Sequence, residues 1–417
     1  MTNEEFIRLH READVRRLAL RRAPEGIDLK WCLQQIEGWQ LARRKLPRWA
    51  ATEGLWYPPR LALEQCSSQE TAQYKADIVH RLIPAARRQS MADLTGGLGA
   101  DFSQLAPLFC QAAFVELQPD LLELARHNLP LLGIKNAVTL SPVQSFTFSP
   151  FQLVYIDPAR RDTAGRKTVR IQDCTPDLLA LQDQLLPRCR WLMAKLSPML
   201  DITQALRALK NVREVHVVSL HGECKELLFL MEGVKEEEKE GTPPLFHCVN
   251  LGTDEEPLTY GPPSDGPSVG LRPSGQSIVH CQLSIVNYPL SIVNYPFLYE
   301  PNASILKAGL QDVLPERYPV RKLHPMSHLF VSDRPVPRFP GRRFRILGFS
   351  DFSRQSLRDL LAGLRQANLS VRNFPASVAT LRRQLKLREG GHIHLFATTA
   401  GDGSHILIKA QRTETAT

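Results

Sequence analysis

Short apolar runs alternate with helix-like stretches between about residue 90 and residue 220 of this chain. Six of these runs have the length of buried strands: Met91–Leu94, Ala113–Leu117, Ala137–Leu140, Leu153–Ile156, Trp191–Leu196 and Val215–Leu220. Apolar residues at helical spacing lie between them, most clearly at Pro119–Leu132 and Asp201–Leu209. Continuous apolar strands separated by helices predict a parallel sheet that is covered by helices on both faces.

A seventh apolar run, KELLFLME, follows the sixth after only the residues HGEC. A connection this short does not cross over a sheet, so the seventh strand must pair antiparallel with the sixth. The pattern therefore predicts an α/β fold with a Rossmann-like sheet of six parallel strands and an antiparallel seventh.

Helices are predicted on the N-terminal side of this sheet. Thr2 is the expected N-cap of a helix over residues 2–22, and a second helix is expected over residues 28–45. A third helix is expected over residues 68–82, directly before the first strand. These patterns predict an N-terminal helical region in front of the sheet.

The chain changes character after the seventh strand. Residues 231–280 are rich in charge, Pro, Gly and Ser around one possible strand at 245–251, and the heptapeptide LSIVNYP then occurs twice, at 283–289 and 290–296. Strand and helix patterns alternate again over 341–412. We therefore expect four parts: a helical region at 1–63, an α/β core at 64–232, a linker, insertion and small α+β segment at 233–340, and a basic α+β domain at 341–417.

Positive charge is concentrated near the C-terminus. The chain has a net charge of +9, yet residues 313–417 hold 18 Lys and Arg against 7 Asp and Glu, a net charge of +11. This asymmetry favours a polyanionic partner for that region, most simply nucleic acid. A basic surface without a partner is the alternative, because charge excess alone specifies no ligand.

Composition and residue spacing bear on membrane contact, on the compartment and on metal binding. No apolar stretch approaches the roughly 18–20 residues of a membrane span, and the first residues, MTNEEFIRLH, lack a signal pattern, so we expect a cytoplasmic protein without membrane contact. The eight cysteines form no C-x-x-C pair, and the histidines show no ligand spacing, so we expect no metal. His392 and His394 are expected at the surface of one strand.

The stretch ADLTGGLGAD, from Ala92 to Asp101, ends the first predicted strand and leads into a helix-like segment. Gly96, Gly97 and Gly99 allow positive φ angles and a close approach of the backbone to a ligand. The N-terminus of the following helix adds N–H donors. Many nucleotide-binding folds contain such a turn, so the stretch predicts a ligand of that general type.

Two acidic residues accompany this turn. Glu116 follows the second strand, where an acid accepts hydrogen bonds from both ribose hydroxyls. Asp93 stands ahead of the glycines, where it binds the amino group of a methionyl tail or orients the turn. The glycines lack the G-x-G-x-x-G spacing, and an antiparallel seventh strand is atypical of nucleotide dehydrogenases, so we favour S-adenosylmethionine over NAD.

The fourth strand ends in YIDPARRD. Pro158 stiffens this loop, so that Asp157 is held beside the transferred methyl group. Catalytic loops of the D/N-P-P-Y type have a proline and an aromatic residue at the positions of Ala159 and Arg160, and that aromatic residue stacks on a flipped base. Arg160 or Arg161 is expected to contact a substrate phosphate or base instead, and a turn with surface arginines is the alternative.

Further candidates lie at the same edge of the predicted sheet. Glu223 and Lys225 follow the sixth strand and are expected to face the site. Cys224 between them is either a nucleophile activated by Lys225 or a buried structural cysteine. Lys195 and Ser197 end the fifth strand at this edge.

One segment before the first strand, EQCSSQETAQYKA, has two interpretations. Ser67 or Ser68 is the expected N-cap of the third helix, with Glu70 completing a capping box. In the second interpretation Ser67, Thr71 and Lys75 also border the cofactor tail.

Together these blocks resemble the class I methyltransferases that carry a C-terminal THUMP-like domain. The matching stretches extend over nearly the whole chain: EQCSSQETAQYKA, DLTGGLGAD, the E-x-Q turn, ARHN, YIDPARRD, LSPMLD, HGECKELLF, YEPNASILKAG and VRNFP. The resemblance implies a Rossmann-like methyltransferase core, S-adenosylmethionine as cofactor and an RNA substrate. Its cofactor residues carry over onto Asp93, Thr95, Gly96, Gly97, Gly99 and Glu116, and its catalytic loop onto residues 157–161.

One departure from the resemblance concerns the adenine. The stretch SPVQSF after the third strand lacks the acid that many methyltransferases direct at the adenine amino group. Gln144 or the backbone is expected to hold adenine instead.

The sequence thus predicts an RNA base methyltransferase. We expect Asp157, Pro158, Arg160, Glu223 and Lys225 to serve catalysis, with Asp157 also at the cofactor, while the basic C-terminal domain binds RNA. A C5-pyrimidine methyltransferase with Cys224 as nucleophile, a small-molecule methyltransferase and a non-catalytic RNA-binding protein are the alternatives.

Overall fold

A computed structural model describes residues 1–140, 150–159, 171–233, 243–261 and 295–413 of the chain. It divides into two compact units, Met1–Val215 with Glu226–Pro244, and His216–Lys225 with Leu245–Thr417. Within the described ranges, no helix combines the length and the apolar character that crossing a bilayer requires.

The first unit begins with a helical region, as predicted. Its helices are α1 (Asn3–His10), α2 (Val15–Ala19), α3 (Leu29–Lys45), α4 (Pro47–Ala50) and α5 (Arg60–Gln65). Thr2 caps α1 through a capping box with Glu5, so this expected N-cap is confirmed. The single helix expected over residues 2–22 is wrong, because the Asp14 carboxylate accepts from the N–H groups of Arg16 and Arg17 and starts a new helix.

The sheet of the first unit follows the predicted order. Its strands are β1 (Ser90–Asp93), β2 (Gln111–Val115), β3 (Ala137–Leu140), β4 (Phe151–Ile156), β5 (Cys189–Leu196), β6 (Val212–Leu220) and β7 (Glu223–Glu232). The spatial order is β3-β2-β1-β4-β5-β7-β6. Neighbours from β3 to β5 are parallel and β7 is antiparallel to β5, so the predicted Rossmann-like fold is confirmed. The boundary between the two units runs through β6 and β7.

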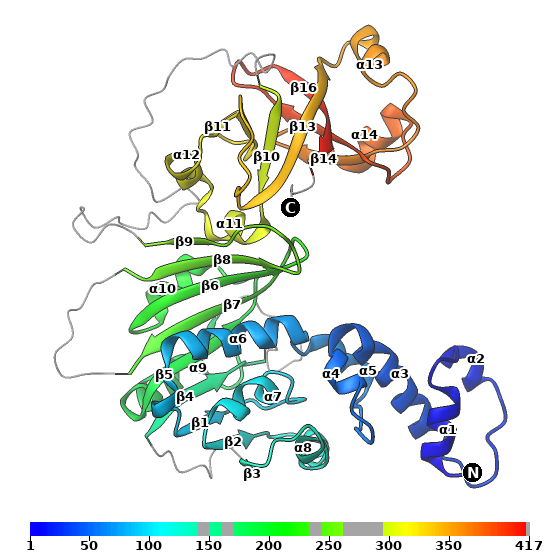
Figure 1. Cartoon of the computed structure of the whole chain (residues 1–417), viewed down its shortest axis with the longest axis vertical. Helices are drawn as coiled ribbons and strands as arrows, with labels where there is room; N and C mark the ends of the chain where they lie inside the picture. The colour runs from blue at the N-terminus through cyan, green and yellow to red at the C-terminus, as the bar shows by residue number, and fades with distance from the viewer. Residues whose placement is uncertain (141–149, 160–170, 234–242, 262–294, 414–417) are drawn as a thin grey trace. The chain divides into compact units, whose positions relative to one another are not determined.

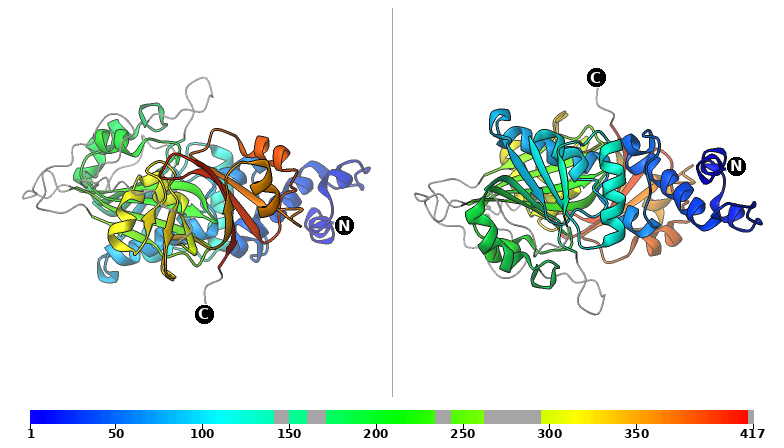
Figure 2. Two further views of the ribbon diagram at one scale, coloured as in Figure 1. Left: turned by 90° about the horizontal axis from the view of Figure 1, so that it is seen from above. Right: turned by 90° about the horizontal axis from the view of Figure 1, so that it is seen from below.

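Helices cover both faces of this sheet (Figures 1 and 2). They are α6 (Gln69–Leu82), α7 (Phe102–Leu105), α8 (Pro119–Leu131), α9 (Leu178–Leu185) and α10 (Ile202–Ala208). Right-handed crossovers on the two sides of β1 place α7 and α8 on one face and α9 and α10 on the other. The central strands are therefore almost wholly buried, from Leu153 to Ile156 and from Leu192 to Ala194. Such strands read as continuous apolar runs in the sequence.

The second unit contains a seven-stranded sheet and a hairpin that lies next to β6 in the order of the first sheet, where His216–Leu220 of β6 belong to this unit. The hairpin strands are β8 (Leu245–Leu251) and β9 (Leu258–Tyr260), and the former confirms the expected strand at 245–251. The sheet strands are β10 (Phe297–Pro301), β11 (Arg321–Lys322), β12 (Phe330–Ser332), β13 (Gly341–Ser350), β14 (Asn368–Arg372), β15 (Ile393–Thr399) and β16 (His405–Arg412). Their order is β11-β12-β10-β13-β16-β15-β14. The helices are α11 (Ala303–Ala308), α12 (Leu314–Arg317), α13 (Arg354–Leu360) and α14 (Val378–Leu385).

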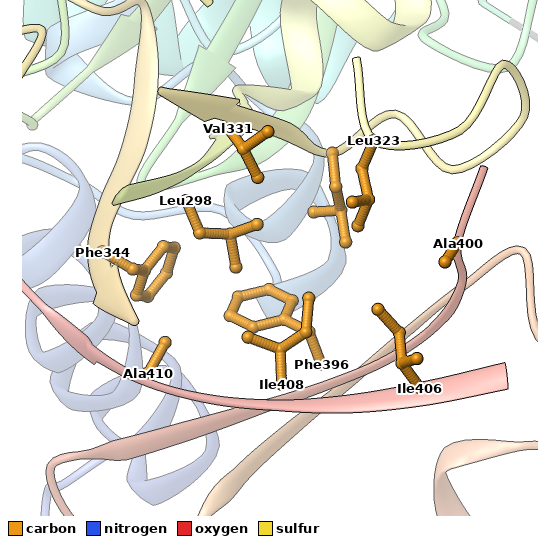
Figure 3. Close-up of a cluster of buried hydrophobic side chains, with 10 residues drawn as sticks. Leu298, Leu323, Val331, Phe344, Phe396, Ala400, Ile406, Ile408 and Ala410 are labelled. Carbon is orange, nitrogen blue, oxygen red and sulfur yellow. The ribbon is translucent and has the colours of Figure 1, made fainter. Parts of the chain in front are cut away.

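One face of this sheet carries a hydrophobic cluster (Figure 3). Its members come from several strands, from the segment between β11 and β12 and from the residue after β15: Leu298, Leu323, Leu329, Val331, Phe344, Phe396, Ala400, Ile406, Ile408 and Ala410. Strands on both sides of residue 341 thus share one sheet and one core. The four-part division drawn from the sequence stays a prediction.

We expect Phe344→Ala to destabilise the second unit by about 3–5 kcal/mol, because Phe344 is fully buried in this cluster and truncation leaves a cavity. Leu347 lies on the same strand but is 48% exposed, so Leu347→Ala should cost less than about 1 kcal/mol. Urea unfolding followed by hydrogen exchange in β13–β16 measures both variants. Equal losses in the two variants would contradict the assigned core face.

Candidate active site

The glycine turn lies between β1 and α7 and is held by backbone hydrogen bonds. The Gly96 N–H donates to the Val115 carbonyl at 2.8 Å, and the Gly99 N–H donates to the Gly96 carbonyl at 2.8 Å. Gly97 and Gly99 have φ angles of +54° and +87°, which favour glycine. Gly96 is needed for another reason, since a Cβ there would lie 2.3 Å from the Phe114 ring.

Glu116 lies against this turn. Its carboxylate accepts from the Gly97 N–H at 2.6 Å through Oε2 and from the Gln118 N–H at 2.8 Å through Oε1. The residue is 7% exposed. The acid at the end of β2 is therefore directed toward the glycine turn, as a residue that binds ribose hydroxyls has to be.

Asp93 ends β1 beneath the same turn. Its Oδ1 accepts from the Thr95 N–H at 2.9 Å, and the residue is 1% exposed. Burial raises the pKa of this carboxyl well above its usual range, and the nearby Asp101, Asp157 and Glu116 add to the rise, while the bond from Thr95 opposes it. A buried carboxyl of this kind gains most from a cationic partner, such as an ammonium group.

Asp157 ends β4 and is joined to the glycine turn by Thr95. The Asp157 N–H donates to Thr95 Oγ1 at 2.6 Å, and the Asp157 carboxylate forms an ion pair with Lys195 at the end of β5. The Asp157 side chain is 37% exposed, whereas that of Lys195 is 12% exposed. Pro158 is buried, and the Ala159 N–H donates to the Thr175 carbonyl at 2.7 Å. The loop is thus fixed on both sides of a partly accessible carboxylate.

A buried chain of charges supports this pair. Lys75 on α6 is fully buried and lies 3.0 Å from Asp101 and 2.6 Å from Glu226. Asp101 also accepts from the Tyr155 hydroxyl at 2.7 Å and lies 3.9 Å from the ammonium group of Lys195. We name Lys75, Asp101, Glu226, Lys195 and Asp157 the buried charge chain. Positive and negative groups alternate along it, so each cation has two carboxylate neighbours.

The protonation states follow from these contacts. Burial alone would raise the pKa of Asp101, but the charges of Lys75 and Lys195 outweigh it and lower that pKa to about 2. Burial raises the pKa of Glu226, against the opposing charge of Lys75. Burial would lower the pKa of Lys195, but Asp157, Asp101 and Glu226 raise it above its usual range. Lys195 therefore stays a cation near neutral pH and is not available as a base.

These residues fit the cofactor that the sequence predicts. A Cβ at Gly97 would meet only the Thr95 carbonyl, at 3.7 Å, so the turn leaves its backbone open to a ligand. Glu116 offers carboxylate oxygens of the kind that accept from hydroxyl groups, and Asp93 offers a buried carboxyl of the kind that pairs with an ammonium group. With Asp93 and Glu116 added, the carboxylates at this edge outnumber Lys75 and Lys195, which favours a positively charged ligand.

The structure brings only part of the predicted set together. Asp93, Thr95, Gly97, Glu116 and Asp157 are linked by the bonds given above. Arg160, Arg161 and Gln144 lie outside the described residues, so their roles stay predictions.

The candidates at the start of β7 also stay predictions. Lys225 lies 2.6 Å from Glu223, whose side chain is 75% exposed. Cys224 between them is partly buried. The next residue, Glu226, is the one that is buried in the charge chain.

Sequence reasoning missed Asp101, Tyr155 and Glu226. Each stands within a stretch that the analysis singled out, but none carries a local signal that separates it from its neighbours. Ser67 was expected as an N-cap or at the cofactor tail, yet its hydroxyl donates to Asp101 at 2.8 Å. Ser68 caps α6 instead, by accepting from the Thr71 N–H, so the capping box expected with Glu70 does not form.

Comparisons with known proteins extend over both units. Two family models match the second unit, a ferredoxin-like domain over residues 297–340 and a THUMP domain-like model over residues 341–412. The solved structure of a candidate methyltransferase from Porphyromonas gingivalis W83 is 32% identical, with a TM-score of 0.79, and the match covers 99% of this chain and 98% of that one.

Two curated proteins are also similar. They come from Mycobacterium tuberculosis strains CDC 1551 and H37Rv, and each is described as an uncharacterized S-adenosylmethionine-dependent methyltransferase. Each is 27% identical over 349 residues, which are 82% of this chain and 84% of the relative.

We expect Asp93→Asn to change how stability depends on pH. Because the pKa of Asp93 is raised in the folded state, the neutral carboxyl favours folding and the ionised carboxylate opposes it. The wild type therefore loses stability as pH rises from about 4, the pKa of an unfolded aspartate, through the raised pKa. Asparagine keeps the carbonyl oxygen that accepts from Thr95 and removes the charge. The melting temperature of the variant minus that of the wild type should therefore grow with pH. If the two melting temperatures change in parallel with pH, folding does not raise the pKa of Asp93.

Proposed function

Since the chain belongs to the family of S-adenosylmethionine-dependent methyltransferases with a THUMP-like domain, we propose that it methylates RNA. The observation that carries the RNA substrate is the positive charge at the C-terminal end of the second unit. Residues 313–417 have a net charge of +11 and include the THUMP domain-like segment. A polyanion is the substrate class that this charge attracts most strongly.

The first unit supplies the cofactor site. In this proposal Glu116 holds the ribose hydroxyls, Asp93 and Thr95 face the methionyl tail, and the backbone at Gly96, Gly97 and Gly99 contacts the cofactor closely. Gln144 stays the residue that the sequence predicts for binding the adenine. The bound cofactor supplies an activated methyl group on a positively charged sulfur.

The residues of the charge chain prepare the acceptor. Asp157 accepts a hydrogen bond from an amino group of the base, which directs the nitrogen lone pair toward the methyl group. Lys195 stays protonated and fixes the Asp157 carboxylate, so Asp157 is the group of this pair that receives the acceptor proton. Pro158 keeps the loop rigid, and Arg160, with Glu223 and Lys225, completes the predicted catalytic set.

Tritiated S-adenosylmethionine and total RNA from cells that lack the gene test this function. We expect label in RNA, and nucleoside mass spectrometry then identifies the methylated base. Label confined to small molecules would favour a small-molecule methyltransferase. Cofactor binding without any transfer would favour a non-catalytic RNA-binding protein.

We expect Glu116→Ala to weaken S-adenosylmethionine binding by roughly tenfold to a hundredfold, because hydrogen bonds to a charged group are lost. Isothermal titration calorimetry measures the affinity. Glu123→Ala is the matched control, since Glu123 is exposed on α8 and the charge change is the same. Equal affinities in the two variants would remove Glu116 from the cofactor site.

We expect Asp157→Asn to lower methyl transfer to RNA by about a hundredfold or more at saturating cofactor, because an amide does not accept the proton. Asp183→Asn is the control, since Asp183 is an exposed partner of Lys210. Single-turnover transfer rates compare the two variants. Full activity of Asp157→Asn would show that Asp157 takes no proton.

A further inference from the structure

The hydrophobic cluster of the second unit ends in a polar rim on the same sheet face. Side chains two residues apart on a strand share a face, so four cluster residues each have a polar companion two positions away. The pairs are Leu298 with Glu300, Phe344 with Arg342, Phe396 with His394, and Ala410 with Arg412. Their strands β10, β13, β16 and β15 are consecutive in the sheet, and Figure 3 shows the four apolar members.

The polar companions are joined by ion pairs. Glu300 is 2% exposed and lies opposite Arg342 in the register of β10 and β13. Arg342 donates to one carboxylate oxygen of Glu300, and Arg372, at the end of β14, lies 2.5 Å from the other. The side chains of Arg342 and Arg372 remain 36% and 35% exposed. One buried carboxylate therefore orients two arginines that still reach solvent.

Positive charge is in surplus at this rim. Arg342 and Arg372 pair with one carboxylate, that of Glu300, and Arg412 lies close enough to His394 to act on its charge, so three arginines gather around one carboxylate among the described residues. The His394 ring lies 4.9 Å from the Phe344 ring, between centroids, and is half-buried, although the sequence placed it at the surface. Burial lowers the pKa of His394, Arg342 and Arg412 lower it further, and Glu300 opposes them. Two arginines thus lie near the half-buried imidazole, with Glu300 as the opposing charge.

We propose that Arg342, Arg372, Arg412 and His394, oriented by Glu300, bind the phosphate backbone of RNA. We name this set the arginine rim. Arginine donors match phosphate oxygens in pairs, and the ion pairs with Glu300 hold two of the side chains before the ligand arrives. The inference rests on the proposed RNA substrate and adds which residues contact it.

The test uses the full chain and a fluorescein-labelled single-stranded oligouridylate, followed by fluorescence anisotropy. Arg412→Gln and Arg372→Gln should each weaken binding by roughly threefold to tenfold and reduce the salt slope by about one. Arg358→Gln on α13 is the matched control, because Arg358 is exposed and the charge change is the same. It should bind like the wild type.

Two further variants separate binding from folding. Glu300→Gln removes the ion pairs that hold Arg342 and Arg372, so RNA binding should weaken severalfold even though the positive charge of the rim rises. Tighter binding of this variant would show that Glu300 only offsets charge and does not orient the arginines. RNA binding should strengthen as pH falls from 8 to 6, because bound phosphate favours protonated His394 over the opposing charges of Arg342 and Arg412. His394→Gln should weaken this pH dependence.

Several results would overturn the arginine rim. Equal losses in Arg412→Gln and Arg358→Gln would show a general charge effect. Competition by polyglutamate as strong as by RNA would favour an acidic protein partner. Absence of RNA binding by the wild type would overturn both the inference and the RNA substrate. Binding that depends on Arg412, together with no methyl transfer to RNA, would overturn the proposed function alone.

Discussion

A fully buried ammonium group imposes the strictest constraint on the first unit. Lys75 has no exposed surface, and a buried charge is tolerated only with close counter-charges. Its two partners come from distant parts of the chain, Asp101 before α7 and Glu226 on β7. The ion pairs therefore hold α6, the glycine turn and the start of β7 in one arrangement. Through Asp101 the same constraint reaches Lys195 and Asp157.

Opposite charges gather at two places in the chain, one on each unit. The edge of the first sheet gathers more carboxylates than ammonium groups, whereas residues 313–417 have a net charge of +11. In the proposed function, a cationic methyl donor and a polyanionic acceptor require opposite potentials, and one surface does not provide both. The edge of the first sheet then supplies the negative potential, and residues 313–417 of the second unit supply the positive one.

The sequence predicted the first sheet well because its strands are buried on both faces. Burial on both faces turns β4 and β5 into continuous apolar runs, and the short link between β6 and β7 required an antiparallel pair. The break between α1 and α2 was missed, because the Asp14 cap competes with a helical pattern that continues on both sides. The single sheet of the second unit was missed as well, since the pairing of β10 with β13 joins residues that are far apart in the chain.

In the candidate site, too, some features follow from the sequence and others only from the tertiary structure. The sequence by itself determined the positive φ angles of Gly97 and Gly99 and the positions of Asp93, Glu116 and Asp157, because backbone preferences and strand ends act within a few residues. Only the tertiary structure decided that Gly96 must leave room for Phe114, that Lys75 joins Asp101 to Glu226, and that Arg342 and Arg372 share Glu300. Packing and ion pairing depend on which strands become neighbours, and no short stretch of sequence contains that information.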